Sequence, residues 1–424
     1  MGAPRRLDDL SHAELAVIAR EFLLAGQMID RAGMPHLISA YGRDEMRDIA
    51  IDEWMGASPI YSRRMQRALR FEGDDVSTIF KGMQLDVGAP PEFMDFRYEV
   101  HDHDHGEFWL DHCGALVDVE PMGDDYVVAM CHHIEDPTFE ATACASNPRA
   151  RMTPIHRPPR APADRHPHCH WTVDIVADAD PIAEPDAAVL MASTRAARAV
   201  VEPFGGTNGD DRGWPDYSHA LDPDMRLEDF SRRSLSVIAQ EACLQGHLLA
   251  ISFFAAIERR HGAEAAAAVA DRQFVGVAGM TAGRLRSALG LGGDLTDVAT
   301  VFELHPAFHP RGYIDWSVDL EGDRLTLELR ECDALAESAA GSWITLLANG
   351  HFAGLDAIAR GVDPRAAVMP RPPARGGRAA WEVLIGDEPA AEFAEVALTR
   401  FSSGAEFVFR RVGRRSGDSD PDPS

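Results

Sequence analysis

Several residue types and signatures are scarce in this chain of 424 residues. It contains only six cysteines, too few for a disulfide framework at this length. It has no uninterrupted apolar run of about 18 residues, and its first residues lack the apolar segment of a secretory signal. The sequence therefore predicts a cytoplasmic protein without a membrane-spanning segment, whose cysteines are available for metal binding or catalysis.

Basic residues are also in the minority. The chain has 41 lysine and arginine residues against 68 aspartate and glutamate residues, which gives a formal net charge of −27. This charge repels nucleic acids and anionic membrane surfaces, so we expect neither as a partner. We also find no Gly-x-Gly-x-x-Gly segment opening a helix after a strand, no Walker loop and no Gly-x-Ser-x-Gly elbow. A small organic molecule is the expected partner.

An internal repeat organises the chain. Residues 7–26 match residues 227–246 at a constant offset of 220, with identical residues at half of the positions. Residues 110–116 match residues 329–335 further along, in the same order. A colinear series of matches indicates tandem duplication. The expected organisation is a first copy at 7–200, a linker at 201–226, a second copy at 227–412 and a disordered tail at 413–424.

Each copy changes character along its length. Ser11 and Glu14 form the N-terminal signature of a helix with apolar positions near a 3.6-residue period, and residues 44–55 and 62–71 continue in the same style. Residues 94–107 alternate between apolar and polar side chains, as strands do. The sequence predicts an α+β fold, in which each copy has a helical N-terminal part followed by an antiparallel sheet. We expect the copies to pack as an intramolecular pseudo-dimer, and a homodimer of the whole chain stays open.

Candidate metal ligands gather in the first copy. His101, His103 and His105 alternate with aspartates, so on a strand all three imidazoles lie on one face. Imidazole is a common ligand of zinc and ferrous iron, which makes a divalent Zn or Fe(II) ion the expected cofactor. Thiols and imidazoles recur downstream, and the further candidate ligands are Cys131, His132, His168 and Cys169. In the alternative interpretation these histidines form a polar strand end that binds nothing.

The residues around this predicted centre suggest catalytic roles. Glu135 and Asp136 follow Cys131 closely, and a carboxylate near a metal-bound water can accept its proton. Cys113 is the candidate catalytic thiol. Arg157 lies in a proline-rich segment and is the candidate donor to a substrate carboxylate. The alternatives are that the two carboxylates cap a helix or face solvent, and that the arginine belongs to a structural turn.

The second copy lacks most of these groups. At an offset of 219, the three alternating histidines are replaced by Leu320, Gly322 and Arg324. The thiol of Cys113 persists as Cys332. We therefore expect an active first copy and a degenerate, structural second copy.

The order of the cysteines resembles a known superfamily. Cys113, Cys131, the segment FEATAC at 139–144 and Cys169 before the Trp171 strand are similar to the 4-vinyl reductase domains and the L-2-amino-thiazoline-4-carboxylic acid hydrolase-like proteins. The resemblance covers the later half of each copy. It implies an α+β sandwich that encloses a small molecule, often as a dimer. It also implies that zinc ligation or thiol catalysis falls to Cys113, Cys131, Cys144 and Cys169.

These patterns favour a metal-dependent enzyme that acts on a small organic molecule, with hydrolysis as the favoured reaction. A non-haem iron oxidoreductase at the same site is one alternative. A small-molecule-binding or sensory module with at most a structural zinc ion is the other.

Overall fold

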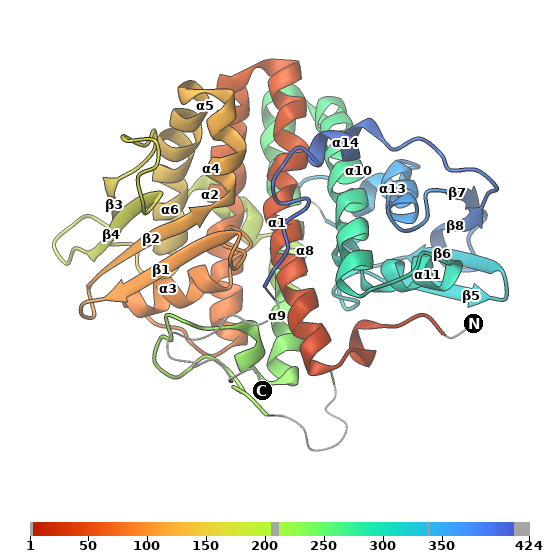
Figure 1. Ribbon diagram of the computed structural model, residues 1–424, viewed down its shortest axis with the longest axis horizontal. Helices are drawn as coiled ribbons and strands as arrows, with labels where there is room; N and C mark the ends of the chain where they lie inside the picture. The colour runs from red at the N-terminus through yellow and green to blue at the C-terminus, as the bar shows by residue number, and fades with distance from the viewer. Residues whose placement is uncertain (1–2, 205–211, 338, 411–424) are drawn as a thin grey trace, which may run out of the picture.

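The predicted α+β class is confirmed. The structure is a computed structural model that describes residues 3–204, 212–337 and 339–410. It is 52% helical and 15% strand, with two four-stranded antiparallel sheets. Long helices occupy the middle of the molecule, and one sheet lies on each side of them (Figure 1). Part of the predicted linker and the predicted tail at 413–424 lie outside the described residues.

The helices and strands follow a similar order in the two halves of the chain, except that the first half has one additional helix between its two strand pairs and another after its last strand. The first half contains α1 (His12–Tyr41), α2 (Arg43–Ala68), α3 (Val76–Gln84), β1 (Met94–Val100), β2 (His105–Cys113), α4 (Gly114–Val119), α5 (Asp124–Val128), α6 (Glu135–Cys144), β3 (Ala150–His156), β4 (Cys169–Ile175), α7 (Asp186–Ala192) and α8 (Arg195–Arg198). The second half contains α9 (Arg232–His261), α10 (Ala263–Ala288), α11 (Leu295–Leu304), β5 (Trp316–Glu321), β6 (Arg324–Arg330), α12 (Trp343–Ala348), α13 (Ala353–Val362), β7 (Ala366–Arg371), β8 (Gly377–Ile385) and α14 (Ala394–Thr399).

The first helix begins where the sequence predicts. The Ser11 side chain accepts a hydrogen bond from the Glu14 backbone, and the Glu14 carboxylate accepts one from the Ser11 backbone, which completes the capping box. Gly42 separates α1 from α2 with a φ of 89°, a conformation that favours glycine. The predicted stretch at 44–55 and most of the one at 62–71 belong to one continuous helix, α2, which ends three residues before the second stretch does.

The prediction of a single strand over residues 94–107 is wrong. Residues 101–104 form the turn between β1 and β2. The Asp102 carboxylate accepts hydrogen bonds from the backbone N–H groups of Asp104 and His105, at 2.8 and 2.9 Å. An aspartate that bonds the backbone two or three residues ahead stabilises a turn, and this local chemistry overrides the alternating pattern.

The two sheets have the same strand order. In the first half the order is β1-β2-β4-β3, and in the second half it is β5-β6-β8-β7, with every pair antiparallel. The matching helices also agree in length, since α1 and α9 have 30 residues each and α2 and α10 have 26 each.

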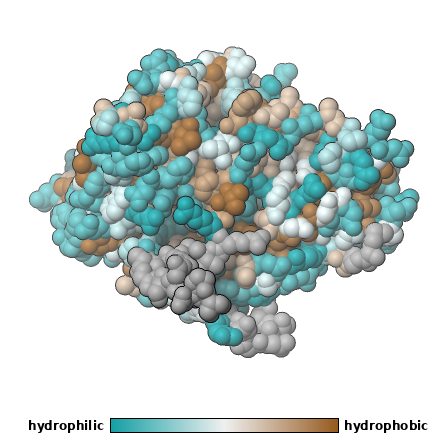
Figure 2. Space-filling model, in the orientation of Figure 1, coloured by the Kyte–Doolittle hydropathy of each residue, from teal (hydrophilic) through white to brown (hydrophobic). Residues whose placement is uncertain are grey.

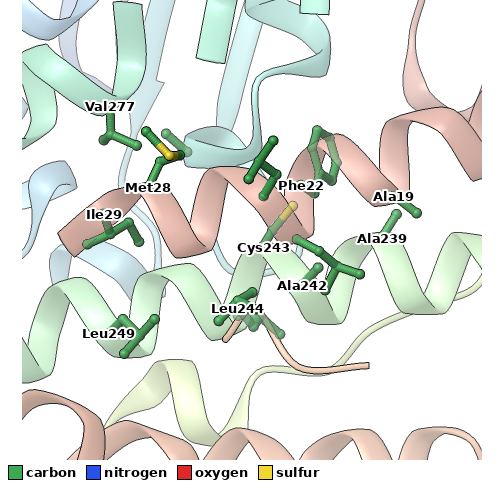
Figure 3. Close-up of a cluster of buried hydrophobic side chains, with 14 of the residues drawn as sticks. Ala19, Phe22, Met28, Ile29, Ala239, Ala242, Cys243, Leu244, Leu249 and Val277 are labelled. Atoms are coloured by element: carbon green, nitrogen blue, oxygen red, sulfur yellow. The ribbon is translucent and has the colours of Figure 1, made fainter. Parts of the chain in front are cut away.

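The hydrophobic core extends across the contact between the two halves of the chain. α1 packs along both α9 and α10, and α9 also packs along α2. Figure 3 shows side chains of α1 facing those of α9, among them Ala19, Phe22 and Cys243. Small residues at this contact allow the two helices to approach closely, and the apolar side chains around them are withdrawn from water. The halves therefore share one continuous hydrophobic core.

One described helix, α9, is long and apolar enough to cross a membrane by length and composition alone. Its most apolar window has a mean hydropathy of 1.3, and 89% of that window is buried inside the protein. Core helices pass the same criterion, so this is weak evidence for a membrane span.

Candidate functional site

Three cysteines of the first half meet in its interior. Cys113 ends β2, Cys131 lies in a π-helical turn at Ala129–Ile134, and Cys169 begins β4. Because β2 and β4 are antiparallel neighbours with Leu110 opposite Cys169, the two strand cysteines come to the same end of the sheet. All three side chains are buried.

A carboxyl group completes this set. Glu135, the first residue of α6, follows the π-helical turn and interacts electrostatically with all three thiols. We call Cys113, Cys131, Cys169 and Glu135 the thiol cluster. π-Helical turns are often found at functional sites, and here the turn connects directly to the carboxyl group.

Burial governs the charge of the thiol cluster. Burial raises the pKa of the Glu135 carboxyl to about 8, although the nearby Arg157 guanidinium works in the opposite direction. Burial and the neighbouring Glu135 raise the pKa of Cys113 to about 12 and also raise the pKa values of Cys131 and Cys169. The cluster is therefore largely protonated and neutral near pH 7.

Two further predicted residues lie beside the cluster and bind each other. Arg157 forms an ion pair with Asp136. It also approaches the backbone carbonyl oxygen of Cys131 at 3.5 Å, and its guanidinium lies over the Trp171 ring at 5.7 Å from the ring centroid. Arg157 therefore lies beside the thiol cluster, and Asp136 partly balances its positive charge.

The other predicted metal ligands near the thiol cluster form hydrogen bonds with backbone groups. The His132 ring nitrogen Nε2 lies 2.7 Å from the Pro158 carbonyl oxygen. His168 is buried, and its Nδ1 accepts a hydrogen bond from the Cys113 backbone N–H at 3.2 Å. Burial lowers the pKa of His168 to about 4, so this imidazole is neutral. Cys144 is half-buried at the end of α6 among Glu140, Arg151 and Arg63, and burial raises its pKa to about 11.

The three alternating histidines lie far from the thiol cluster. β2 begins with His105 and ends with Cys113, a span of about 26 Å at 3.3 Å per residue. His101 and His103 belong to the exposed turn that precedes this strand. The Nδ1 atoms of His103 and His105 lie 2.8 Å from the carboxylates of Asp104 and Asp102, which raise the pKa values of both imidazoles. The histidines that the alternating pattern assigned to a common strand face are thus distributed around a hairpin turn.

No metal group is formed in the described part of the chain. Nowhere in it do three His, Cys, Asp or Glu side chains come together in an arrangement that could hold an ion. The donor chemistry of the thiol cluster, soft thiolates with one carboxylate, matches zinc and ferrous iron. The side chains as placed do not make a closed ligand set.

A second buried polar cluster lies around Tyr61 on α2, with members from α1, from α2 and from the residues after α3, and our sequence analysis missed it. It consists of the carboxyl groups of Asp30, Glu53 and Asp86, which we call the carboxyl cluster. Trp54 donates a hydrogen bond to Asp30 at 2.8 Å, and Tyr61 donates one to Asp86 at 2.9 Å. Within the described residues, neither Glu53 oxygen has a hydrogen-bond donor, and this side chain is fully buried.

Burial also raises the pKa values of the carboxyl cluster. Burial raises the pKa of Glu53 well above its ordinary value, with Asp30 adding to the effect, and it raises the pKa of Asp86 to about 6. Burial also raises the pKa of Asp30, which Arg31 opposes. Because Arg31 also favours the ionised form of Cys113, it lies within electrostatic range of both clusters.

A comparison of the two halves of the sequence distinguishes the residues of the carboxyl cluster. At the offset of 220, Asp30 corresponds to Ala250, Arg31 to Ile251 and Glu53 to Gln273. Ionisable residues at these positions therefore occur in the first half alone, in common with the cysteines of the thiol cluster other than Cys113. A residue-by-residue comparison of the helices at the offset of 220 would have identified these acidic residues.

Comparisons with known proteins add no assignment: no family model, curated protein or solved structure matches this chain.

Proposed function

We propose that this chain is an enzyme that acts on a small organic molecule at the thiol cluster of its first half. The observation that supports the proposal is the meeting of three buried thiols with the half-buried carboxyl group of Glu135 in one place. Groups with strongly shifted pKa values concentrate at functional sites, because catalytic acids and bases need pKa values matched to their reaction. In the second half, Cys169 is replaced by Ala379.

Hydrolysis is the favoured reaction. Glu135, with a pKa of about 8, is protonated near neutrality and can donate its proton to a leaving group. Arg157 beside it provides a guanidinium for an anionic group of the substrate, once that group replaces Asp136 as its partner. Neutral imidazole at His168 positions the Cys113 backbone.

A divalent zinc or ferrous ion stays part of the proposal as the cofactor that the donors suit. Cys113, Cys131 and Cys169 are the residues that would hold it, after rearrangement of the side chains described above, and Glu135 would keep its proton-transfer role. When bound, zinc supplies a polarised water for hydrolysis, and ferrous iron supplies redox chemistry. The iron-dependent alternative thus uses the same residues.

We further propose that the two halves arose by tandem duplication and pack as a pseudo-dimer, with the second half as the degenerate copy. The equal helix lengths and the common strand order support this proposal. Two buried ion pairs related by the offset of 220, Arg64 with Glu241 and Arg284 with Glu21, also support it. An experimental structure in which the halves fail to superpose would contradict it. Cytoplasmic location and the lack of nucleic acid and membrane partners stay predictions.

The enzyme proposal is tested with Glu135→Gln. We would screen the purified chain against ester, amide and cyclic amide substrates, and measure the rate as a function of pH. We expect a titration near pH 8 in the active protein and at least a 100-fold loss of rate in Glu135→Gln. Cys332→Ser, at the second-half position that matches Cys113, is the control and should keep full activity. Equal rates in Glu135→Gln and the original chain would overturn the proposal.

The metal is tested separately, on protein purified without chelators. One zinc or iron ion per chain, lost in folded Cys131→Ser and retained in Cys332→Ser, would support a metal-dependent enzyme. If the metal-free protein has activity that depends on Glu135, the proposed site is retained and the proposed metal cofactor is rejected.

A further inference from the structure

A large groove lies at the junction of the two halves, on the side of the second half. Its walls come from α1, α10, α13 and α14, and from residues 405–410 of the C-terminal segment. Its volume is about 1210 Å³, which accommodates an organic molecule of considerable size. In Figure 1 the C-terminal segment crosses α1 after leaving α14, and Figure 2 shows hydrophobic residues at the centre of this same face.

Much of the groove wall is apolar. Met280 and Val396 are buried side chains that line it, and Phe393, Phe407 and Phe409 are further lining residues. An apolar wall of this size favours the hydrocarbon or aromatic part of a ligand.

The groove exists partly because α10 carries a glycine. Gly283 lines it, and a Cβ atom added there would meet only the Gly361 carbonyl oxygen, at 3.8 Å. At the matching position of the first half stands Arg63, whose long side chain pairs with Glu184. The open space is therefore a feature of the second half that the first half does not share at this position.

The charge of the lining is opposite to that of the chain. Seven arginines and five glutamates line the groove, whereas the whole chain carries a net charge of −27. Several of these arginines are engaged in ion pairs, such as Arg20 with Glu228 and Arg284 with Glu21. Arg286 differs: it donates to the Gly292 carbonyl oxygen at 3.1 Å and forms no direct ion pair with any described residue, although it lies within electrostatic range of Asp363. Its guanidinium is available to a ligand, and the corresponding first-half residue is Gln66.

We propose that this groove binds an amphipathic organic anion, with the apolar part against Phe393 and Val396 and the carboxylate or sulfonate at Arg286. This site is independent of the thiol cluster, because the two share no residue. A cationic ligand of the same length would meet the arginine surplus and bind more weakly. A neutral ligand would lack the charge-assisted hydrogen bond to the guanidinium.

The proposal is tested by fluorescence titration of the full chain with 8-anilinonaphthalene-1-sulfonate, an aromatic anion. We expect saturable binding of one molecule per chain and displacement by decanoate at a concentration at least 10-fold lower than by decylamine. Displacement by both competitors at equal concentrations would overturn the anion assignment.

Two variants locate the binding. Gly283→Leu fills the groove with a residue that helices tolerate well, and should abolish binding. Arg286→Gln, which introduces the first-half residue, should raise the dissociation constant of decanoate at least 10-fold. Arg324→Gln, at the exposed first residue of β6, is the control and should bind normally. Urea unfolding of each variant confirms that it is folded. Normal binding by folded Gly283→Leu would overturn the proposal.

A chain that ends at Arg410 decides whether the groove is occupied by the protein itself. Equal binding by this shorter chain and the full chain supports the organic anion as the occupant. Binding by the shorter chain alone would show that residues 411–424 fill the groove, and would overturn the proposal.

Discussion

The guanidinium of Arg64 on α2 and the carboxylate of Glu241 on α9 form a two-pronged ion pair in the core, with N–O distances of 2.7 and 2.9 Å. Both side chains are buried, at 7% and 5% exposure. Arg64→Ala leaves Glu241 buried without its counter-ion, so we expect the free energy of unfolding to fall by about 3–5 kcal/mol in urea titrations.

Two controls separate this effect from a general cost of losing arginine. Arg324→Ala removes an exposed ion pair with Glu382 and should cost less than about 1 kcal/mol. The double variant Arg64→Met/Glu241→Leu removes both charges and should recover at least half of the loss. A loss below about 1 kcal/mol in Arg64→Ala would contradict a stabilising role for the buried pair.

Glu53→Gln should stabilise the protein increasingly as the pH rises. The raised pKa of Glu53 means that the folded state holds a proton that the unfolded state releases above about pH 4.5. The stability that the folded protein gains by binding this proton is therefore complete below about pH 4.5 and is lost as the pH rises. The advantage of the variant should grow by up to about 1.4 kcal/mol per pH unit from about pH 5.5 up to the raised pKa of the folded state.

Urea unfolding across this pH range measures the effect. Gln273 occupies the matching position of the second half, so the substitution suits the helix. Glu99→Gln, on the exposed part of β1, should leave the pH dependence unchanged. An advantage of Glu53→Gln that does not vary with pH would show that the carboxyl ionises freely in the folded protein.

The thiols of the thiol cluster should resist alkylation. With a pKa of about 12, Cys113 carries a thiolate fraction about 10³-fold or more below that of a free cysteine at pH 7.5. Iodoacetamide labelling followed by mass spectrometry should find Cys113, Cys131 and Cys169 unmodified in the native chain and modified in urea. Rapid labelling of Cys131 in the native chain would mean that the cluster is open to solvent and ionised.

Asp118→Ala should release the C-terminal segment. The Asp118 carboxylate on α4 accepts hydrogen bonds from the Ser403 backbone at 2.8 Å and from the Ser403 hydroxyl at 2.6 Å, and it also binds Ser402. Without these bonds, trypsin should cleave after Arg400 at least 10-fold faster, as followed by mass spectrometry. Asp125→Ala on α5 is a control, and an unchanged cleavage rate in Asp118→Ala would show that apolar contacts alone hold the segment.

The sequence predicts local structure and class well, but it does not predict which side chains meet. The Ser11 cap and the α+β class follow from short-range patterns. The meeting of Cys113 and Cys169 depends on strand register, which a single sequence does not encode in any short motif. The turn at Asp102 shows a different kind of error. The alternating pattern predicts a strand there, but hydrogen bonds from the backbone to the Asp102 side chain stabilise a turn.

The carboxyl cluster was missed for a related reason. Asp30 lies 12 residues before Gly42 and Glu53 lies 11 residues after it, and only the antiparallel packing of α1 and α2 makes them neighbours. Acidic residues inside amphipathic helices are normally placed on the solvated face, and the helix pattern alone gives no reason to expect them in the core.

The crossed packing of the central helices has a consequence for how the chain is made. α1 and α2 are synthesised long before α9 and α10, yet their apolar faces are covered by those later helices. A ribosome would expose these faces until residue 288 has emerged, and contacts between segments more than 200 residues apart form slowly. Nascent chains of this protein should therefore depend on chaperones that hold apolar helices during translation.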